Sequence, residues 1–330
     1  MSAAWLLSDI AESKGRQQFF TERAPEALRA LRDRARVESV ESSNRIEGIV
    51  VEPGRLQPLV LGGTRPRDRS EEEITNYRRA LDLIHQSSHE LEVSPSLLQR
   101  LHGMVQAGSG DAGQWKSADN DIIEHTEAGP LIRFRPVSAV GTPDAVAELC
   151  QNYYRLVQKE TMPPLVAIAG LVFDFLCIHP FRDGNGRISR LLTLLVLYQQ
   201  GFEVGRYVSL ERLVEESRED YYDVLQRSSE NWHDGKHDPT PWLHFFLSLI
   251  RRAYRLLEDR AEQLQDARGD KTAQVELAVA SFEREFSLAE LVEACPGVSR
   301  DMVRHVLQGL RKAGRVEVTG QGRAARWRVR

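Results

Sequence analysis

Residues 179–190 read HPFRDGNGRISR, a short polar stretch between two strongly apolar segments. One apolar segment runs from Leu165 to Ile178 before it, and the other runs from Leu191 to Tyr198 after it. The first has fourteen residues and contains an aspartate, whereas a membrane-spanning helix needs about 20 apolar residues. We therefore expect a mainly α-helical protein in which a polar loop joins two buried helices, and no membrane association.

The composition of this loop predicts an anion-binding site. Gly184, Asn185 and Gly186 allow left-handed backbone angles and close approach of a ligand to main-chain N–H groups. These groups lead into the start of the second helix, where unpaired N–H donors and the helix dipole favour an anion. Arg187 and Arg190 share a face of that first turn, where positive charge is unfavourable by roughly 0.3–1 kcal/mol unless an anion compensates. Two arginines there indicate a bound polyanion.

Two further side chains of the loop suit chemistry on a bound phosphate. Asp183 supplies a hard carboxylate oxygen, which Mg²⁺ accepts together with phosphate oxygens. His179 belongs to the residue type that titrates near neutrality and can take a proton from an attacking hydroxyl. Without the rest of the loop, a histidine and an aspartate at such positions are more often turn and cap residues.

The whole stretch resembles the signature of Fic domains, H-P-F-x-D/E-G-N-G-R-x-x-R, and every specified position is present. The resemblance implies a Fic-type helical core with a short β-hairpin flap. It also implies a protein adenylyltransferase, which moves AMP from ATP to a Ser, Thr or Tyr hydroxyl of a protein and uses Mg²⁺. The roles that it implies are general base for His179, Mg²⁺ ligand for Asp183, anion hole for Gly184, Asn185 and Gly186, and nucleotide-phosphate contacts for Arg187 and Arg190.

The resemblance covers about residues 40–250, with comparable features at Gly113-Gln114-Trp115, Leu131 to Pro136, Tyr221-Tyr222 and Trp242. Residues 131–136 resemble the flap, whose strand edge would dock a segment of the protein substrate; an ordinary surface hairpin is the alternative. Tyr221 and Tyr222 would wall the nucleotide site, and core packing is their alternative explanation. Related domains often have Asn where this chain has Ser229, so the contact to the base stays open.

A second motif lies before the domain. The run Ser43-Asn44-Arg45-Ile46-Glu47-Gly48 fits the S/T-x-x-x-E-G/N inhibitory motif of Fic proteins, near the end of a helix expected over about residues 27–48. Ser43 and Glu47 share a face of that helix, and a carboxylate is unfavourable at its C-terminal end. The resemblance implies that Glu47 pairs with Arg190 and removes a contact that the ATP γ-phosphate needs. A Ser/Glu pair on a solvated helix, or a glutamate used to remove AMP from a target, are the alternatives.

Punctuation along the chain predicts further element boundaries. Ser70, followed by three glutamates, predicts a helix start, and so do Ser94-Pro95 and Thr142-Pro143. Pro53-Gly54 predicts a turn, and residues 108–141 form the one long region expected to be non-helical.

The C-terminal part has a different pattern. Helices expected at residues 288–294 and 299–313, then strands at 315–318 and 327–329 joined by a turn at 320–322, predict a winged helix-turn-helix. A polar linker is expected at 268–272. The domains would then be an N-terminal helical region (1–110), a Fic core (111–266) and the winged helix (273–330).

Charge is unevenly distributed over these regions. The chain of 330 residues carries a formal charge of −4, but residues 296–330 alone carry nine Lys and Arg against two Asp and Glu. Their net charge of +7 predicts DNA binding, with Arg300 and Arg304 on the recognition helix and Arg323 and Arg326 on the wing. A module for protein contact or dimerisation is the alternative, and a homodimer is compatible with the sequence.

Composition bounds the remaining possibilities. With 41% hydrophobic and 28% charged residues the chain can bury a globular core, and three scattered cysteines form no disulfide framework or clustered metal site. The N-terminus has an apolar stretch too short for a signal peptide, so we expect a cytoplasmic protein. The rival function is a DNA-binding transcriptional regulator that uses the Fic-like part as a nucleotide sensor. The intact His179 and Asp183 favour the enzyme.

Overall fold

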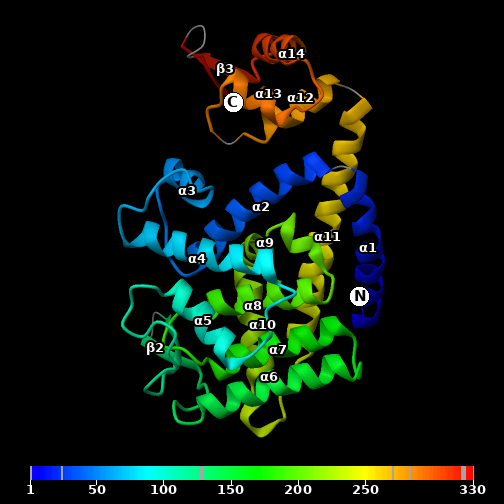
Figure 1. The fold of residues 1–330 in the computed structure, drawn as a ribbon. Coiled ribbons are helices and arrows are strands. Elements are labelled where there is room, and N and C mark those ends of the chain that lie inside the picture. The colour runs from blue at the N-terminus through cyan, green and yellow to red at the C-terminus, as the bar shows by residue number, and fades with distance from the viewer. Residues whose placement is uncertain are drawn as a thin grey trace. The chain divides into compact units, whose positions relative to one another are not determined.

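A computed structural model describes residues 2–23, 25–126, 129–269, 271–282, 284–320 and 325–329 (Figure 1). The chain divides into two compact units, one of residues 1–17 and 33–254 and the other of residues 18–32 and 255–330. Most of the expected N-terminal region, residues 33–110, belongs to the same unit as the expected Fic core. The physical reason is that two of its helices, α4 and α5, pack against the core helix α8.

The helices that begin in the first 254 residues fill most of that length. In chain order they are α1 (Ala3–Arg23), α2 (Pro25–Ile46), α3 (Pro53–Val60), α4 (Arg69–Ser87), α5 (Pro95–Val105), α6 (Thr142–Gln158), α7 (Pro164–Ile178), α8 (Asn185–Gln199), α9 (Leu210–Glu216), α10 (Arg218–Ser229) and α11 (Thr240–Gly269), with 3₁₀ turns η1 (Glu203–Arg206) and η2 (Trp232–Asp234). The mainly α-helical fold class is confirmed. None of the helices in the described ranges combines the length and apolar character of a membrane span.

Helix α8 lies at the centre of this unit. Its residues are buried along almost its whole length, and it packs against α4, α5 and α7. The expected pair of apolar helices is therefore present as α7 and α8, with the polar loop between them. Because α8 is surrounded by other helices, the loop at its N-terminus is held on several sides.

Local capping explains where several helices begin. Asp68, rather than the expected Ser70, caps α4, and its side chain accepts the Glu71 N–H at 2.9 Å. Ser94 caps α5 as expected. The turn expected at Pro53-Gly54 is wrong: these residues begin α3, because proline is favoured in the first turn of a helix, where its missing N–H has no partner to lose.

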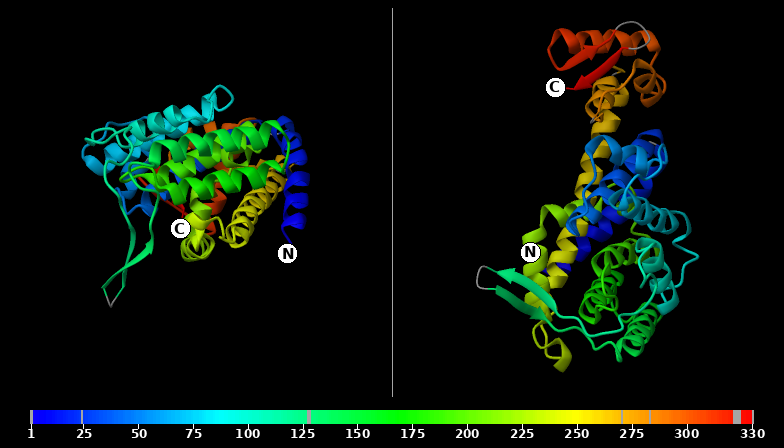
Figure 2. Two further views of the ribbon diagram at one scale, coloured as in Figure 1. Left: turned by 90° about the horizontal axis from the view of Figure 1, so that it is seen from below. Right: turned by 90° about the vertical axis from the view of Figure 1, so that its left-hand side faces the viewer.

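The long non-helical region contains a β-hairpin. Strand β1 (Ile122–Thr126) pairs antiparallel with β2 (Gly129–Phe134), and Ile123 lies opposite Ile132. The hairpin projects away from the helices in both views of Figure 2. The sequence predicted the second arm at residues 131–135 but not its partner β1.

The second unit has a small core of its own. It contains α12 (Lys271–Ala280), α13 (Leu288–Ala294), α14 (Arg300–Lys312) and the antiparallel strands β3 (Val316–Thr319) and β4 (Arg326–Val329). Buried residues from all three helices and β3 pack together. The linker expected at 268–272 is wrong, since α11 extends to Gly269 and α12 begins at Lys271.

The order of elements after residue 288 agrees with the predicted winged helix-turn-helix. Ser299 caps α14 through its side chain, as expected, and Phe286 forms a β-bridge with Trp327. Part of the expected turn, residues 321–322, lies outside the described residues. The assignment of this unit to the winged-helix class stays a prediction.

Candidate functional site

The loop between α7 and α8 is shaped by two left-handed residues and one buried amide. His179 ends α7 with φ 50° and ψ 60°, and Gly184 precedes α8 with φ 79°. The Asn185 side chain accepts the Phe181 N–H at 2.9 Å and donates to the Phe181 carbonyl at 2.8 Å. Both polar groups of that side chain are therefore used inside the loop. The main-chain N–H groups of Asn185 and Gly186 remain at the start of α8, where an anion is favoured.

Asp183 presents its carboxylate beside this helix start. Its Oδ1 accepts the Gly184 N–H at 2.6 Å, and its Oδ2 accepts the Gln106 amide at 3.1 Å. The side chain is still 72% exposed and lies 3.8 Å from the Arg187 guanidinium. Among the residues that the structure describes, no group of three or more His, Cys, Asp or Glu could hold a metal ion. A cation at Asp183 would need phosphate and water ligands, which is how Mg²⁺ usually binds.

His102 of α5 holds the same loop from behind. The Gly113 N–H donates to His102 Nδ1 at 2.9 Å, so Nε2 carries the proton and donates to the Asp183 carbonyl at 3.1 Å. The ring also stacks on Phe181 with 3.9 Å between centroids. Burial lowers the pKa of His102, which favours the neutral tautomer that these two hydrogen bonds require.

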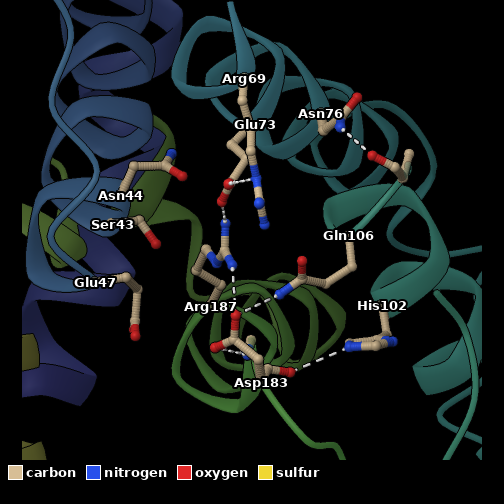
Figure 3. A network of polar contacts seen from close by, with 12 residues as sticks. Ser43, Asn44, Glu47, Arg69, Glu73, Asn76, His102, Gln106, Asp183 and Arg187 are labelled. Atoms are coloured by element: carbon tan, nitrogen blue, oxygen red, sulfur yellow. Dashed lines mark hydrogen bonds and ion pairs between the residues drawn. The ribbon is translucent and has the colours of Figure 1, made fainter. Parts of the chain in front are cut away.

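Arg187 is buried and held by a residue that the sequence did not single out for this site. Its Nη1 donates to Glu73 Oε2 at 2.8 Å, and Glu73 in turn pairs with Arg69 at 3.3 Å. Figure 3 shows these contacts continuing through Asp183 to Gln106 and His102. The Arg187 Nε is buried and finds no hydrogen-bond partner among the described residues. A ligand or water beside Arg187 would satisfy it.

Arg190 is held by the last turn of α2. Its Nε donates to Ser43 Oγ at 2.9 Å, and its Nη2 donates both to the Ser43 carbonyl at 2.9 Å and to Glu47 Oε1 at 2.7 Å. Only 7% of the Arg190 side chain is exposed. The Glu47–Arg190 pair that the resemblance implied is thus present in the structure, with Ser43 as a second partner.

The Glu47 carboxylate lies directly against Gly186. A Cβ atom at Gly186 would be 2.3 Å from Glu47 Oε1, far inside contact distance. The missing side chain therefore leaves room for an anionic group at the N-terminus of α8. In this structure the Glu47 carboxylate is the anion that occupies that room, and Figure 3 shows it pointing toward the loop.

His179 is half-buried and held in one tautomer. Its Nδ1 lies 3.4 Å from the Leu176 carbonyl, which can only accept, so Nδ1 carries the proton and Nε2 keeps a free lone pair. Burial, and next the nearby charge of Lys116, lower the pKa of His179 to about 4. The imidazole is therefore neutral near pH 7 and able to accept a proton.

The two tyrosines of α10 face different surroundings. Tyr221 is buried, packs on Trp242 and Phe245, and lines an apolar cavity together with Arg190. Tyr222 is 47% exposed. The structure thus brings Tyr221 beside the loop and places Tyr222 at the surface. Their contact with a nucleotide stays a prediction.

Comparison with known proteins identifies the domain. Residues 92–197, which contain α5, the hairpin, α7 and most of α8, match the Fic/DOC family. The chain contains a Fic domain. The match ends before α9, so α2 with Ser43 and Glu47 and the whole C-terminal unit lie outside the matched residues.

Relatives of the Fic domain are recognisable at modest identity. A Fido domain-containing protein from Dictyostelium discoideum is 28% identical over 114 residues, which is 34% of this chain and 71% of that protein. A protein adenylyltransferase Fic from Nematostella vectensis is 24% identical over 49% of this chain, but the match spans only 35% of that protein.

A likeness of fold extends over the full chain. The crystal structure of a Fic family protein from Desulfovibrio desulfuricans matches with a TM-score of 0.63 and 23% identity, and the match covers 100% of this chain and 97% of that one. At this identity the likeness concerns the fold alone. The helical core and the C-terminal unit therefore occur together in another Fic protein.

Proposed function

We propose that the Fic domain transfers AMP from ATP to a Ser, Thr or Tyr hydroxyl of a protein. The observation that carries this proposal is a neutral histidine, His179, in the same short loop as an anion site at the start of α8 and the exposed carboxylate of Asp183. Two relatives are named protein adenylyltransferases, which supports the same activity.

The residues present fit ATP and Mg²⁺. The space over Gly186 accepts an anionic oxygen, because the Glu47 carboxylate already occupies it, and the unpaired Arg187 Nε can donate to a further one. Asp183 would hold Mg²⁺, which supplies charge neutralisation to the phosphates when bound. The two arginines and the helix N-terminus would then orient the phosphates by charge and by main-chain donors.

The chemical step needs one base and one leaving group. The substrate hydroxyl oxygen forms a bond to the α-phosphorus, and the bond from that phosphorus to the oxygen bridging the α- and β-phosphates breaks, which releases pyrophosphate. His179 Nε2 accepts the hydroxyl proton, because Nδ1 already donates to the Leu176 carbonyl. The left-handed backbone at His179 turns the chain so that the ring and the anion site belong to one loop.

Glu47 would act as a brake on this reaction. Its carboxylate fills the anion position over Gly186 and ties up the Arg190 guanidinium. A γ-phosphate at the same place would meet a like charge and would lose the Arg190 contact. Removal of AMP from a modified protein, with Glu47 positioning the attacking water, is the alternative role for the same carboxylate.

The first test compares Glu47→Gly with the wild type, using ATP labelled at the α-phosphate. We expect Glu47→Gly to incorporate label at least tenfold faster into itself and into lysate proteins, and Glu47→Gly with His179→Ala to incorporate none. Glu52→Gly is the matched control, because Glu52 is an exposed glutamate outside the site. Equal labelling by Glu47→Gly and wild type would refute the brake. An absence of labelling in a folded Glu47→Gly variant that binds ATP would refute AMP transfer.

The hairpin is the proposed docking site for the protein substrate. Ile123 and Ile132 lie opposite each other and are 49% and 43% exposed, which gives the hairpin an apolar face as well as a free strand edge. Its base is anchored, because Phe134 packs against Trp232 and His233 of η2. An anchored hairpin can hold a target segment in a defined register.

A second function, DNA binding by the C-terminal unit, is favoured by the surface of α14. Its apolar residues Val303, Val306, Leu307 and Leu310 are buried, while its basic residues Arg300, Arg304, Arg311 and Lys312 are all exposed. One face of a capped helix is therefore basic and free of apolar contacts, as in a recognition helix. Of the expected wing residues, Arg326 pairs with Glu290 at 2.9 Å and Arg323 lies outside the described residues.

A further inference from the structure

Lys116 holds the main chain on both sides of His179. It lies in the loop between α5 and β1, and its side chain is buried. Its Nζ donates to the Ile178 carbonyl at 3.2 Å, and its main-chain N–H donates to the Pro180 carbonyl at 2.9 Å. One residue thus bonds the carbonyl before His179 and the carbonyl after it.

His179 needs such support because of its backbone. A left-handed conformation is sparsely populated by residues with a side chain, and it persists only where the surroundings hold it. The Ile178 carbonyl lies in the last turn of α7, where carbonyls lack partners within the helix. A cation at this end of a helix is favoured by the dipole, so the Lys116 ammonium suits the position.

Stability alone does not explain a buried ammonium at this place. No carboxylate in the described part of the chain forms an ion pair with Lys116, and burial lowers the pKa of its ammonium to about 8. A buried charge without a charged partner costs free energy of folding, and an apolar side chain of similar length would avoid that cost. The neighbour that does feel its charge is His179.

We propose that Lys116 is a positioning residue for His179, which fixes the left-handed end of α7 so that Nε2 faces the substrate hydroxyl. This inference rests on the proposed AMP transfer, in which His179 is the base. Three charged groups act on the imidazole: Lys116 from the loop before β1, Glu47 after α2 and Asp183 in the site loop. Lys116 opposes protonation of His179, and the two carboxylates favour it.

The test uses the full chain with Glu47→Gly as background, so that the brake does not mask the effect. Lys116→Met removes the ammonium at similar length, Lys116→Arg keeps a cation with several donors, and Lys159→Met is the matched control for an exposed lysine at the end of α6. We expect Lys116→Met to lower kcat about 10- to 100-fold with KM for ATP unchanged within twofold. Lys116→Arg should recover most of that loss, and Lys159→Met should equal the background.

A second readout does not depend on activity. The His179 ring is followed by NMR as pH is varied, and its signal is assigned by its absence in His179→Ala. In Lys116→Met we expect the pKa of His179 to rise, so the acid limb of the pH–kcat profile moves to higher pH. If Lys116→Met does not fold, Lys116→Gln, which keeps an amide donor without charge, replaces it in both measurements.

Two results would overturn the proposal. One is a folded neutral variant at Lys116 with kcat and the pKa of His179 both equal to the background. The other is a fall in kcat that Lys116→Arg does not restore and that comes without any change in the pKa of His179. Failure of AMP transfer itself is distinguishable, because the NMR titration would still report whether Lys116 acts on His179.

Discussion

Arg187 and Arg190 stand three residues apart on α8, yet glutamates from different parts of the chain hold them. Glu73 of α4 pairs with Arg187 at 2.8 Å, and Glu47 after α2 pairs with Arg190 at 2.7 Å. Glu47 also lies against Gly186, where a phosphate oxygen is expected, so its departure would free both the space and the Arg190 guanidinium. The Glu73 contact has no such overlap with Gly186. We therefore expect Glu47 to control activity and Glu73 to control the stability of the site.

The first residue-scale prediction concerns Glu73→Gln. Only 2% of the Arg187 side chain is exposed, and after the change its remaining carboxylate neighbour is Asp183 at 3.8 Å. We expect the free energy of unfolding to fall by about 2 kcal/mol, because a buried guanidinium loses its closest charged partner. Urea unfolding followed by circular dichroism measures this.

Glu72→Gln is the control for that measurement, since Glu72 is the exposed neighbour of Glu73 on α4. It should change the free energy of unfolding by less than about 0.5 kcal/mol. Equal stability of the Glu73 and Glu72 variants would contradict the importance of the buried pair.

At the scale of elements, α2 is bound into the first unit along its length. Ser39 Oγ donates to the buried Glu211 of α9 at 2.7 Å, and the Tyr77 hydroxyl of α4 donates to the same carboxylate at 3.2 Å. Arg36 pairs with Asp82 of α4 at 2.5 Å. The position of Glu47 is therefore set by a packed helix and not by a loosely attached segment. Release of the brake needs movement only beyond Ile46, where α2 ends.

The segment that joins α3 to α4 is held by one ion pair whose effect depends on pH. Arg55 donates through Nε and Nη2 to both oxygens of Glu71, at 2.8 and 2.7 Å, and the Arg67 N–H donates to the same carboxylate at 2.8 Å. The Arg55 hydrogen bond is the largest cause that lowers the pKa of Glu71, from near 4.5 to about 2. A lowered pKa stabilises the fold above pH 4.5, and this contribution disappears as pH falls toward 2.

The corresponding prediction compares Glu71→Gln with the wild type by urea unfolding at several pH values. The difference in free energy of unfolding should be constant above about pH 5 and should shrink as pH falls from 4.5 to 2, because protonated Glu71 resembles glutamine. A difference that stays constant down to pH 2 would show that Glu71 titrates normally in the folded protein.

At the scale of the whole molecule, the net charge of −4 hides two opposite contributions. Residues 296–330 carry +7, so the remainder of the chain carries −11. Within the second unit, Glu276 and Glu290 pair with Arg315 and Arg326, while the basic residues of α14 remain exposed. The positive surface available to a polyanion is therefore concentrated on one helix.

The prediction at this scale is salt-dependent DNA binding through α14. In the full chain, replacing both Arg300 and Arg304 by Ala should weaken binding to duplex DNA and reduce the slope of log K against log salt by about 2, because two phosphate contacts are lost. Fluorescence anisotropy over a series of salt concentrations measures this. Replacing Arg155 and Lys159 of α6 by Ala is the control. An unchanged slope in the α14 variant would favour a protein partner for this unit.

Much of the fold and part of the site could be predicted from short stretches of sequence. The loop at 179–190 is contiguous, so its glycines, its carboxylate and its histidine could be assigned together. Ser94 and Ser299 are caps whose effect is confined to one helical turn, and both were predicted correctly. The start of α3 was missed because Pro-Gly is compatible with a turn as well as with a first helical turn, and β1 was missed because its pairing partner defines it.

The sequence by itself determined the helical class, the Fic signature and the basic C-terminal region, because spacing, capping and charge are local properties that neighbouring residues express. Only the tertiary structure decided which side chains support the site. Glu73, Gln106, His102 and Lys116 reach the loop from 62 to 114 residues away. Each is an ordinary polar residue in its own segment. It contacts the loop only because α4 and α5 pack against α8 and the segment after α5 passes beneath His179, and no local pattern records how helices pack.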